Sequence, residues 1–353
     1  MRSFHLTNNI LISTDPKING GISKVNSILK NNFNISNYLI ISNKKPDINI
    51  RSTTWLRCYG KSPILIFNFY WLIKFILKIK KNSNIVLSDP QYSSISLIIF
   101  LLSLFKKHKI FFLTHGFLFH NKEFLIIKKI YFLFITKFLL RFFSVISVSK
   151  TDSKTLKKNN FHNFIEILNG VNKITSSKKK KYKFCLVGRN VVSKNIDKYL
   201  DFLDFYYNQY DASKLKKSVL ISDNTIGLNI KRRNKLNIYS KLNNKNYEKI
   251  ISNTEYILSF SDYEGFGLAI IEGISAGAIP ICKFNDSFNE ILSECRELLF
   301  FEINNDKIFK QIKSIETLDR HKYKVLINKL NLITKSYSIK NMVTKFKKKV
   351  FIN

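Results

Sequence analysis

Two glutamates beside a glycine-rich turn are the part of the sequence that points most directly to chemistry. Glu264 and Glu272 are separated by seven residues within EYILSFSDYEGFGLAIIEGISAGAIP, residues 255–280. The apolar run before Ser261 predicts a strand and the residues from Leu268 onward predict a helix, so Glu-Gly-Phe-Gly is the connecting loop. Carboxylates accept hydrogen bonds from hydroxyl groups, and free amides at a helix start bind anions. The pattern favours a ligand that carries both hydroxyls and phosphates, as a sugar nucleotide does.

Two cations follow another predicted strand. Arg189 and Lys194 lie in FCLVGRNVVSKN, residues 184–195, just beyond the apolar run at 183–187. A guanidinium can hold a phosphate through two parallel hydrogen bonds, and an ammonium adds a compact point charge. We therefore expect both side chains to bind a diphosphate. In so basic a chain, solvated surface positions are the alternative interpretation.

The elements that position these residues follow the rhythm of a parallel α/β sheet, in which short apolar runs alternate with longer amphipathic stretches. The first half predicts strands at 9–13, 38–42, 84–88, 110–114, 143–148 and 164–168, with helices at 21–32, 63–81, 93–107, 123–141 and 150–159. The second half predicts strands at 183–187, 217–222, 235–239, 255–260 and 278–282, with helices at 194–209, 246–253, 267–276, 286–294 and 304–315. A charged, serine-containing stretch between the halves is typical of a linker.

The segments taken together closely resemble glycosyltransferase family 4, a retaining group with the GT-B fold. The resemblance begins with the Glu-x7-Glu pair, the Gly-Arg-x4-Lys segment and the Ala-Gly-x-x-Pro of residues 276–280. It continues, in the family's order, through PKINGGISKV at 16–25, LTHGFLF at 113–119, SVISVSKTDSKTL at 144–156, ILNGVN at 167–172 and Glu290 in NDSFNEIL. The Glu-x7-Glu pair and the Ala-Gly-x-x-Pro belong to one segment, so six segments, with Glu290 in addition, follow the family's order. They cover roughly residues 10–295 and are together far more specific than one motif. Asn195 departs from the family, which usually has glycine after the lysine.

The resemblance implies a fold and a domain organisation. Two Rossmann-like, doubly wound α/β domains would face each other across a cleft. The acceptor-side domain would span residues 1–172, a basic linker 173–182, and the donor-binding domain 183–335. Residues 336–353 would form a C-terminal helix that packs back on the N-terminal domain.

The resemblance also implies roles for single residues. Glu264 would bind the sugar hydroxyls, Glu272 the ribose, and His115 the transferred sugar; a satisfied core histidine is the alternative for His115. The candidate catalytic residues are Glu264, His115, Arg189 and Lys194. The candidate donor-binding residues are Gly20, Gly21, Arg189, Lys194, Glu264, Gly265, Phe266, Gly267, Leu268 and Glu272.

The sequence lacks the motifs of several other chemistries. It contains no Asp-x-Asp, no His-Glu-x-x-His and no Walker loop. These absences disfavour a metal-dependent GT-A transferase, a zinc protease and a P-loop enzyme. One Gly-x-Ser-x-Gly occurs, from Gly273 to Gly277, but it falls at the end of the helix predicted at 267–276 and not at a strand-to-helix turn, so serine hydrolase chemistry is disfavoured too. We expect no metal and no cofactor, because Arg189, Lys194 and the helix amides would stabilise the leaving diphosphate and the nucleotide-sugar is a substrate.

The charge balance suggests an anionic partner. Lys and Arg number 59 against 24 Asp and Glu, a formal charge of +35, although a drifted nucleotide composition is an alternative explanation. Residues 63–81 and 124–143 each place lysines or an arginine on one face of a predicted helix that is rich in aromatic residues. This pattern favours binding to an anionic membrane surface. Buried crossover helices with solvated lysines are the alternative. With no signal peptide, and an uncharged run at 90–105 too short to span a bilayer, we expect a cytoplasmic protein, peripheral on the inner face of the plasma membrane.

On this basis we expect transfer of a sugar from a nucleotide-sugar, with UDP favoured, to a lipid-linked saccharide acceptor. Lipopolysaccharide O-antigen, its core, or capsule would be the product. A nucleic-acid-binding protein and a GT-B sugar-nucleotide epimerase are the alternatives. No nucleic-acid-binding module is recognisable, so no specific nucleic acid is expected as a partner.

Overall fold

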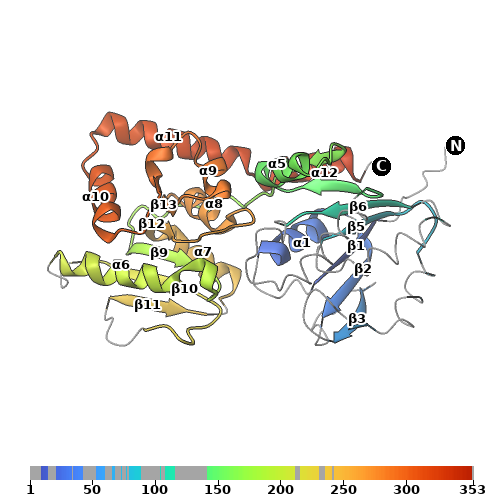
Figure 1. Ribbon diagram of the computed structural model, residues 1–353, viewed down its shortest axis with the longest axis horizontal. Helices are drawn as coiled ribbons and strands as arrows, with labels where there is room; N and C mark the ends of the chain where they lie inside the picture. The colour runs from blue at the N-terminus through green and yellow to red at the C-terminus, as the bar shows by residue number, and fades with distance from the viewer. Residues whose placement is uncertain are drawn as a thin grey trace. The chain divides into compact units, whose positions relative to one another are not determined.

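A computed structural model of the 353-residue chain describes residues 9–14, 21–33, 35–42, 53–59, 66–67, 73, 77, 79–88, 104, 108–115, 141–210, 215–229, 235–240 and 242–351. The chain divides into two compact units, one made of Met1–Asn169 with Lys340–Asn353 and one made of Gly170–Ile339. Figure 1 labels many of the elements of both units, and each unit is described by itself below.

The first unit is built on a sheet of eight strands in the order β4-β3-β2-β1-β5-β6-β7-β8, parallel except for β3 and β4. The strands are β1 (Asn9–Thr14), β2 (Ile35–Ser42), β3 (Thr53–Tyr59), β4 (Ile66–Phe67), β5 (Asn84–Leu87), β6 (Lys109–Leu113), β7 (Ser144–Ser147) and β8 (Phe164–Glu166). Its described helices are α1 (Gly21–Asn32), α5 (Lys150–Lys158) and α12 (Ile339–Lys349). Continuous apolar runs suit such strands because both faces of a parallel sheet are covered.

The end of the chain belongs to this first unit. Met342 and Phe346 of α12 are buried in the same core as Leu11 of β1 and Leu29 of α1. The ring of Phe33 lies 6.0 Å from that of Phe346. Apolar side chains on one face of α12 thus complete the core, while its lysines stay exposed.

One predicted element of the first unit is wrong in part, and others lie largely outside the described residues. The expected helix at 63–81 overlaps β4, whose two residues pair antiparallel with β3, but Ile73 and Leu77 within the same range are helical. No strand is predicted at β3, because its polar and charged residues interrupt the apolar run. Of the helices expected at 93–107 and 123–141, the structure describes Leu104, which is helical, and Arg141, which lies in a turn; the rest, with most of both basic faces, falls outside the described residues.

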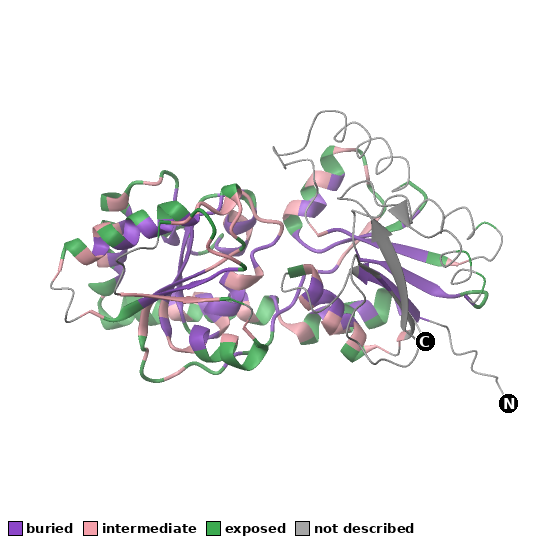
Figure 2. Cartoon of the chain, turned by 90° about the horizontal axis from the view of Figure 1, so that it is seen from below, coloured by how far each residue is buried: buried purple, intermediate pink, exposed green. Residues whose placement is uncertain are grey.

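The second unit is a parallel six-stranded sheet in the order β11-β10-β9-β12-β13-β14. The strands are β9 (Tyr182–Val187), β10 (Lys217–Ile221), β11 (Leu236–Tyr239), β12 (Thr254–Ser259), β13 (Ile279–Lys283) and β14 (Leu299–Phe300). Figure 2 shows the strands of this sheet largely buried, with exposed residues on the helices around them. From β9 the chain adds β10 and β11 on one side, and it then returns to add β12, β13 and β14 on the other side. The switch point therefore lies between β9 and β12, and ligands bind at such a point, beyond the carboxyl ends of the strands.

The helices of the second unit contact one another in two groups, α6 with α10, and α8 with both α7 and α11. Their bounds are α6 (Ile196–Asn208), α7 (Asn244–Ser252), α8 (Leu268–Ser275), α9 (Asp286–Ile291), α10 (Asn305–Glu316) and α11 (Arg320–Ser336). No prediction covered α11 or β14, and α6 begins later than the helix predicted from residue 194. Residues Val192–Lys194 form a separate 3-10 turn, η3.

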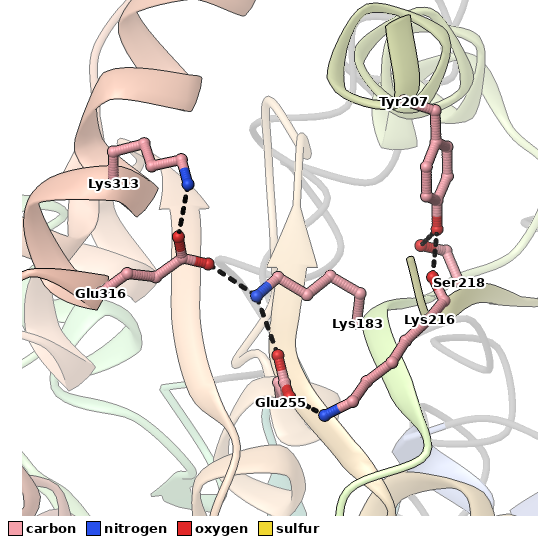
Figure 3. Close-up of polar contacts among 7 residues, drawn as sticks. All are labelled: Lys183, Tyr207, Lys216, Ser218, Glu255, Lys313 and Glu316. Carbon is pink, nitrogen blue, oxygen red and sulfur yellow. Dashed lines mark hydrogen bonds and ion pairs between the residues drawn. The ribbon is translucent and has the colours of Figure 1, made fainter. Parts of the chain in front are cut away.

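An ion network fixes the amino ends of these strands (Figure 3). Lys183 of β9 donates to Glu255 of β12 at 2.9 Å and to Glu316 of α10 at 2.6 Å. Glu255 also accepts from Lys216, and Lys313 lies 3.1 Å from Glu316. The charges sit at the edge of the sheet opposite to the one where ligands bind, so we assign them to stability.

The stretch expected as a linker lies within the second unit. Lys180 donates hydrogen bonds of 2.9 Å to the carbonyls of Ser252 and Ala276, which end α7 and α8. A cation is favourable at a helix C-terminus because the last carbonyls carry partial negative charge. The basic stretch therefore anchors two helices of the second unit. Among the described residues, no helix is long and apolar enough to cross a membrane.

Candidate functional site

The predicted cation and the predicted carboxylate meet at the carboxyl edge of the second sheet. The Lys194 ammonium donates to Glu264 Oε1, with 16% and 17% of the two side chains exposed. Lys194 ends the 3-10 turn that follows β9, and Glu264 lies in the loop that follows β12. The two loops are also joined by their backbones, because the Asp262 amide donates to the Ser193 carbonyl at 2.9 Å.

The residue that departs from the family pattern adopts a conformation that glycine favours. Asn195 has φ 49° and ψ 46°, in the left-handed region, where asparagine is tolerated better than most other non-glycine residues. Its side-chain amide donates to the Phe260 carbonyl at 2.9 Å. Asn195 thus keeps the turn that a glycine would make and ties it to the end of β12.

The start of α8 is shaped by Gly267. This residue has φ 90°, and a Cβ placed on it would lie 2.8 Å from Cε1 of Phe288. Both the backbone angle and the close packing require glycine here. The first amides of α8, at Leu268 and Ala269, have no acceptor within their own helix, and the helix dipole adds partial positive charge at this end.

The second glutamate has a partner that no sequence motif indicates. Glu272 is 8% exposed, and its Oε2 accepts a hydrogen bond of 2.5 Å from the hydroxyl of Tyr247 on α7. Burial, followed by the nearby Glu272 charge, raises the pKa of Tyr247 well above its ordinary value, so the phenol remains a donor. The two glutamates are therefore held by different partners, Glu264 by a cation and Glu272 by a phenol.

The aromatic residue of the Glu-Gly-Phe-Gly loop faces the protein. The Phe266 ring is buried and lies 5.4 Å from that of Tyr337, at an interplanar angle of 73°. The Tyr337 hydroxyl donates to Glu290 Oε1 at 3.3 Å. Any contribution of Phe266 to donor binding would come from its backbone, and its side chain anchors the loop.

Arg189 is exposed, and the residue after it is clamped to the loop that follows β10. The backbone amide of Asn190 donates to Asp223 Oδ1 at 2.7 Å, and its side chain donates to Asn224 Oδ1 and to the Ile226 carbonyl at 3.1 and 2.8 Å. Burial opposes ionisation of Asp223, but hydrogen bonds from the amides of Asn190 and Asn224 prevail and lower its pKa. No spacing rule applied to the sequence indicated this clamp.

In the first unit, His115 follows β6 and lies beside two buried polar residues. Its Nε2 lies 3.1 Å from Ser88 Oγ, and the Ser88 hydroxyl donates to Asn26 Oδ1. The oxygen of Ser88 is then the acceptor for an N–H at Nε2, which leaves the lone pair on Nδ1. Burial lowers the pKa of His115 to about 3, so the ring is neutral at physiological pH. Gly21 begins α1 and is exposed, and Gly20 lies outside the described residues.

The second unit thus combines a helix start, two cations and two carboxylates at one edge of a parallel sheet. Within the described ranges, no group of three or more His, Cys, Asp or Glu is arranged to hold a metal ion. Hydroxyl recognition by carboxylates and phosphate recognition by cations and amides are the chemistry that this edge can provide.

Comparison with solved structures defines the class of fold. HepE from Anabaena, solved with UDP and glucose, has a TM-score of 0.71 at 11% identity, covering 97% of this chain and 98% of its own. Sucrose-phosphate synthase from Thermosynechococcus elongatus also has a TM-score of 0.71, at 13% identity and with the same coverage. The predicted fold class is confirmed: the chain has the GT-B fold, with two α/β domains built on parallel sheets.

Other similar structures are longer than this chain. TarM of S. aureus, solved with UDP among its ligands, has a TM-score of 0.60 at 16% identity over 82% of this chain. The chain spans 60% of that protein and 62% of the matched chain of the GtfA/B complex. No protein-family model matches the sequence, and no curated protein sequence matches it. The structural neighbours are GT-B glycosyltransferases.

Proposed function

We propose that this protein is a retaining, metal-independent glycosyltransferase of the family 4 type that transfers a sugar from a UDP-sugar. The observation that supports this most is the Lys194–Glu264 pair beside the glycine-flanked start of α8, at the carboxyl edge of a parallel sheet. UDP is favoured because HepE and TarM were solved with it.

The proposed reaction needs groups that stabilise a leaving diphosphate. The bond between the anomeric carbon and the phosphate oxygen breaks, and a bond from that carbon to the acceptor oxygen forms on the same face. The acceptor hydroxyl gives its proton to a phosphate oxygen of the departing diphosphate. Arg189, Lys194 and the first amides of α8 would stabilise the negative charge that develops, so neither a carboxylate nucleophile nor a metal is needed.

The carboxylates and the histidine would bind the donor. Glu264 would accept hydrogen bonds from the sugar hydroxyls and Glu272 from the ribose. The neutral His115 would contact the transferred sugar through its Nδ1 lone pair. A lone pair accepts a hydroxyl proton, whereas a protonated ring could only donate.

The acceptor in this proposal is a lipid-linked saccharide used in cell-surface polysaccharide synthesis, such as lipopolysaccharide O-antigen, its core, or capsule. Support comes from the overall charge of +35 and from the exposed lysines of α12, which include Lys347, Lys348 and Lys349. The protein would then work in the cytoplasm, on the inner face of the plasma membrane. Binding to anionic liposomes that weakens with salt, without binding to neutral ones, is the expected result.

Donor hydrolysis in the absence of acceptor tests the proposed reaction. A panel of nucleotides is first screened for thermal stabilisation, and sugar nucleotides of the best base are then assayed in excess EDTA. We expect UDP to stabilise the protein and at least one UDP-sugar to be hydrolysed with EDTA present. Activity that is abolished by EDTA and restored by manganese would contradict metal independence. Binding of nucleic acid without stabilisation by any nucleotide would contradict the transferase assignment.

A further inference from the structure

We infer that Tyr247 is a positioning residue for Glu272, and that it orients this carboxylate toward the ribose hydroxyls of the bound nucleotide. The inference rests on the proposed function and extends it to a residue that neither the sequence motifs nor the comparisons identify.

The location of the pair supports a role at the ligand. Tyr247 is the fourth residue of α7 and Glu272 the fifth residue of α8. These helices follow β11 and β12, so both begin at the carboxyl edge of the sheet, where ligands bind in such folds. The helices contact each other, and the Tyr247 hydroxyl crosses between them to Glu272 Oε2 at 2.5 Å.

The chemistry of the pair suits positioning. A glutamate side chain has several rotatable bonds, and a buried carboxylate needs hydrogen-bond donors. A carboxylate can accept about four hydrogen bonds, and the Tyr247 phenol donates one of them to Oε2. This bond fixes the direction of the Glu272 carboxylate.

The chain offers a matched control for removing this hydroxyl. The Tyr207 hydroxyl donates to the Lys216 carbonyl at 2.9 Å and lies 2.7 Å from Ser218 Oγ, at the amino end of β10 (Figure 3). Tyr247→Phe and Tyr207→Phe each delete one phenolic oxygen and keep the ring. The first variant loses its hydroxyl at the carboxyl edge of the sheet, and the second loses its hydroxyl at the amino edge.

Calorimetry with UDP, 2′-deoxy-UDP and 3′-deoxy-UDP measures whether Tyr247 acts through ribose recognition. We define the deoxy penalty as the factor by which the weaker-binding deoxy analogue binds less tightly than UDP. In the unmodified protein this penalty should be at least about tenfold, as expected for the loss of one hydrogen bond to a charged group. In Tyr247→Phe, UDP affinity should fall about fivefold and the deoxy penalty should shrink to roughly threefold or less. Tyr207→Phe should keep the full penalty.

The outcomes separate this inference from the proposed function. A full deoxy penalty in a folded Tyr247→Phe overturns the positioning role. Equal affinity of the unmodified protein for UDP and both deoxy analogues overturns ribose binding by Glu272, and the inference with it. A folded protein that binds no nucleotide overturns the proposed function itself. If thermal melting shows that Tyr247→Phe does not fold, Tyr247→Leu replaces it. Leucine has no hydrogen-bond donor, so it should also reduce the penalty, and an unchanged penalty overturns the inference.

Discussion

Lys194 and Glu264 are hydrogen-bonded to each other at the carboxyl edge of the second sheet. In the proposed function, Lys194 binds the diphosphate and Glu264 binds the sugar. Because the two side chains are bonded to each other in the structure, each is held in place before the donor arrives. Arrival of the diphosphate would draw the ammonium away and release the carboxylate for the sugar hydroxyls.

This pairing predicts that Glu264→Gln strengthens the binding of UDP and lowers the turnover of the UDP-sugar. Without the carboxylate, Lys194 is no longer neutralised, so UDP should bind about two- to fivefold more tightly, the effect expected for a partly exposed pair. Turnover of the UDP-sugar should fall at least about tenfold, because a charged acceptor for the sugar is lost. Calorimetry and donor hydrolysis measure the two effects. Lys194→Met is the control and should weaken UDP binding; weaker UDP binding by Glu264→Gln would contradict the competition.

Asn195 predicts an effect on both stability and ligand affinity. Asn195→Ala places an alanine in the left-handed region and removes the hydrogen bond to the Phe260 carbonyl, which should cost about 1–3 kcal/mol of unfolding free energy. UDP affinity should fall as well, because the turn carries Lys194. Asn195→Gly should keep more of the unfolding free energy and more of the UDP affinity than Asn195→Ala. Asn160, at φ 62° after α5, is a matched control, since Asn160→Ala should lower only the stability. Equal UDP affinity in all variants would show that the turn does not position Lys194.

The ion network at the amino ends of the strands predicts an acid-dependent stability. Burial opposes ionisation of Glu255, but the hydrogen bonds from Lys216 and Lys183 prevail and lower its pKa. A carboxyl group whose pKa is lower in the folded state stabilises above its unfolded pKa, and this stability is lost as the pH falls through the folded value. Glu255→Gln should therefore cost about 1–2 kcal/mol at pH 7 and less at pH 3. Urea denaturation at both pH values measures this, and Glu302→Gln, in a highly exposed ion pair, should change little. A cost that is equal at both pH values would contradict the ionic role.

His115 predicts a second pH dependence. Its folded pKa of about 3 lies below the ordinary value of 6.5, chiefly because of burial. Between these two pH values the histidine is protonated in the unfolded chain and neutral in the folded protein. The free energy of unfolding should therefore fall as the pH drops from about 6.5 toward 3. His115→Gln should remove this part of the acid sensitivity. Nitrogen NMR should show a neutral ring with the proton on Nε2 between pH 5 and 8, and a titration midpoint near 6.5 would contradict the buried arrangement.

The sequence by itself determined the fold class and the segments that line the candidate site. Parallel strands are short apolar runs covered on both faces, and the helices between them are amphipathic, so periodicity located α1 and β9 within a residue. Glycines at strand-to-helix junctions and the charges beside them marked the loop around Gly267. Elements without a strong apolar pattern, such as β3 and the two-residue β4, were missed or predicted as helix.

Only the tertiary structure decided which of these residues hold one another. The Lys194–Glu264 pair joins side chains 70 positions apart, and the Asn190–Asp223 bond spans 33 positions. Tyr247 reaches Glu272 from a different helix, and no local spacing rule connects them. Local sequence sets propensity and periodicity, which act over a few residues, whereas side-chain partners depend on how the strands order themselves in the sheet. The residue types of the site are therefore visible in the sequence, and the partner that orients each of them is fixed by the fold.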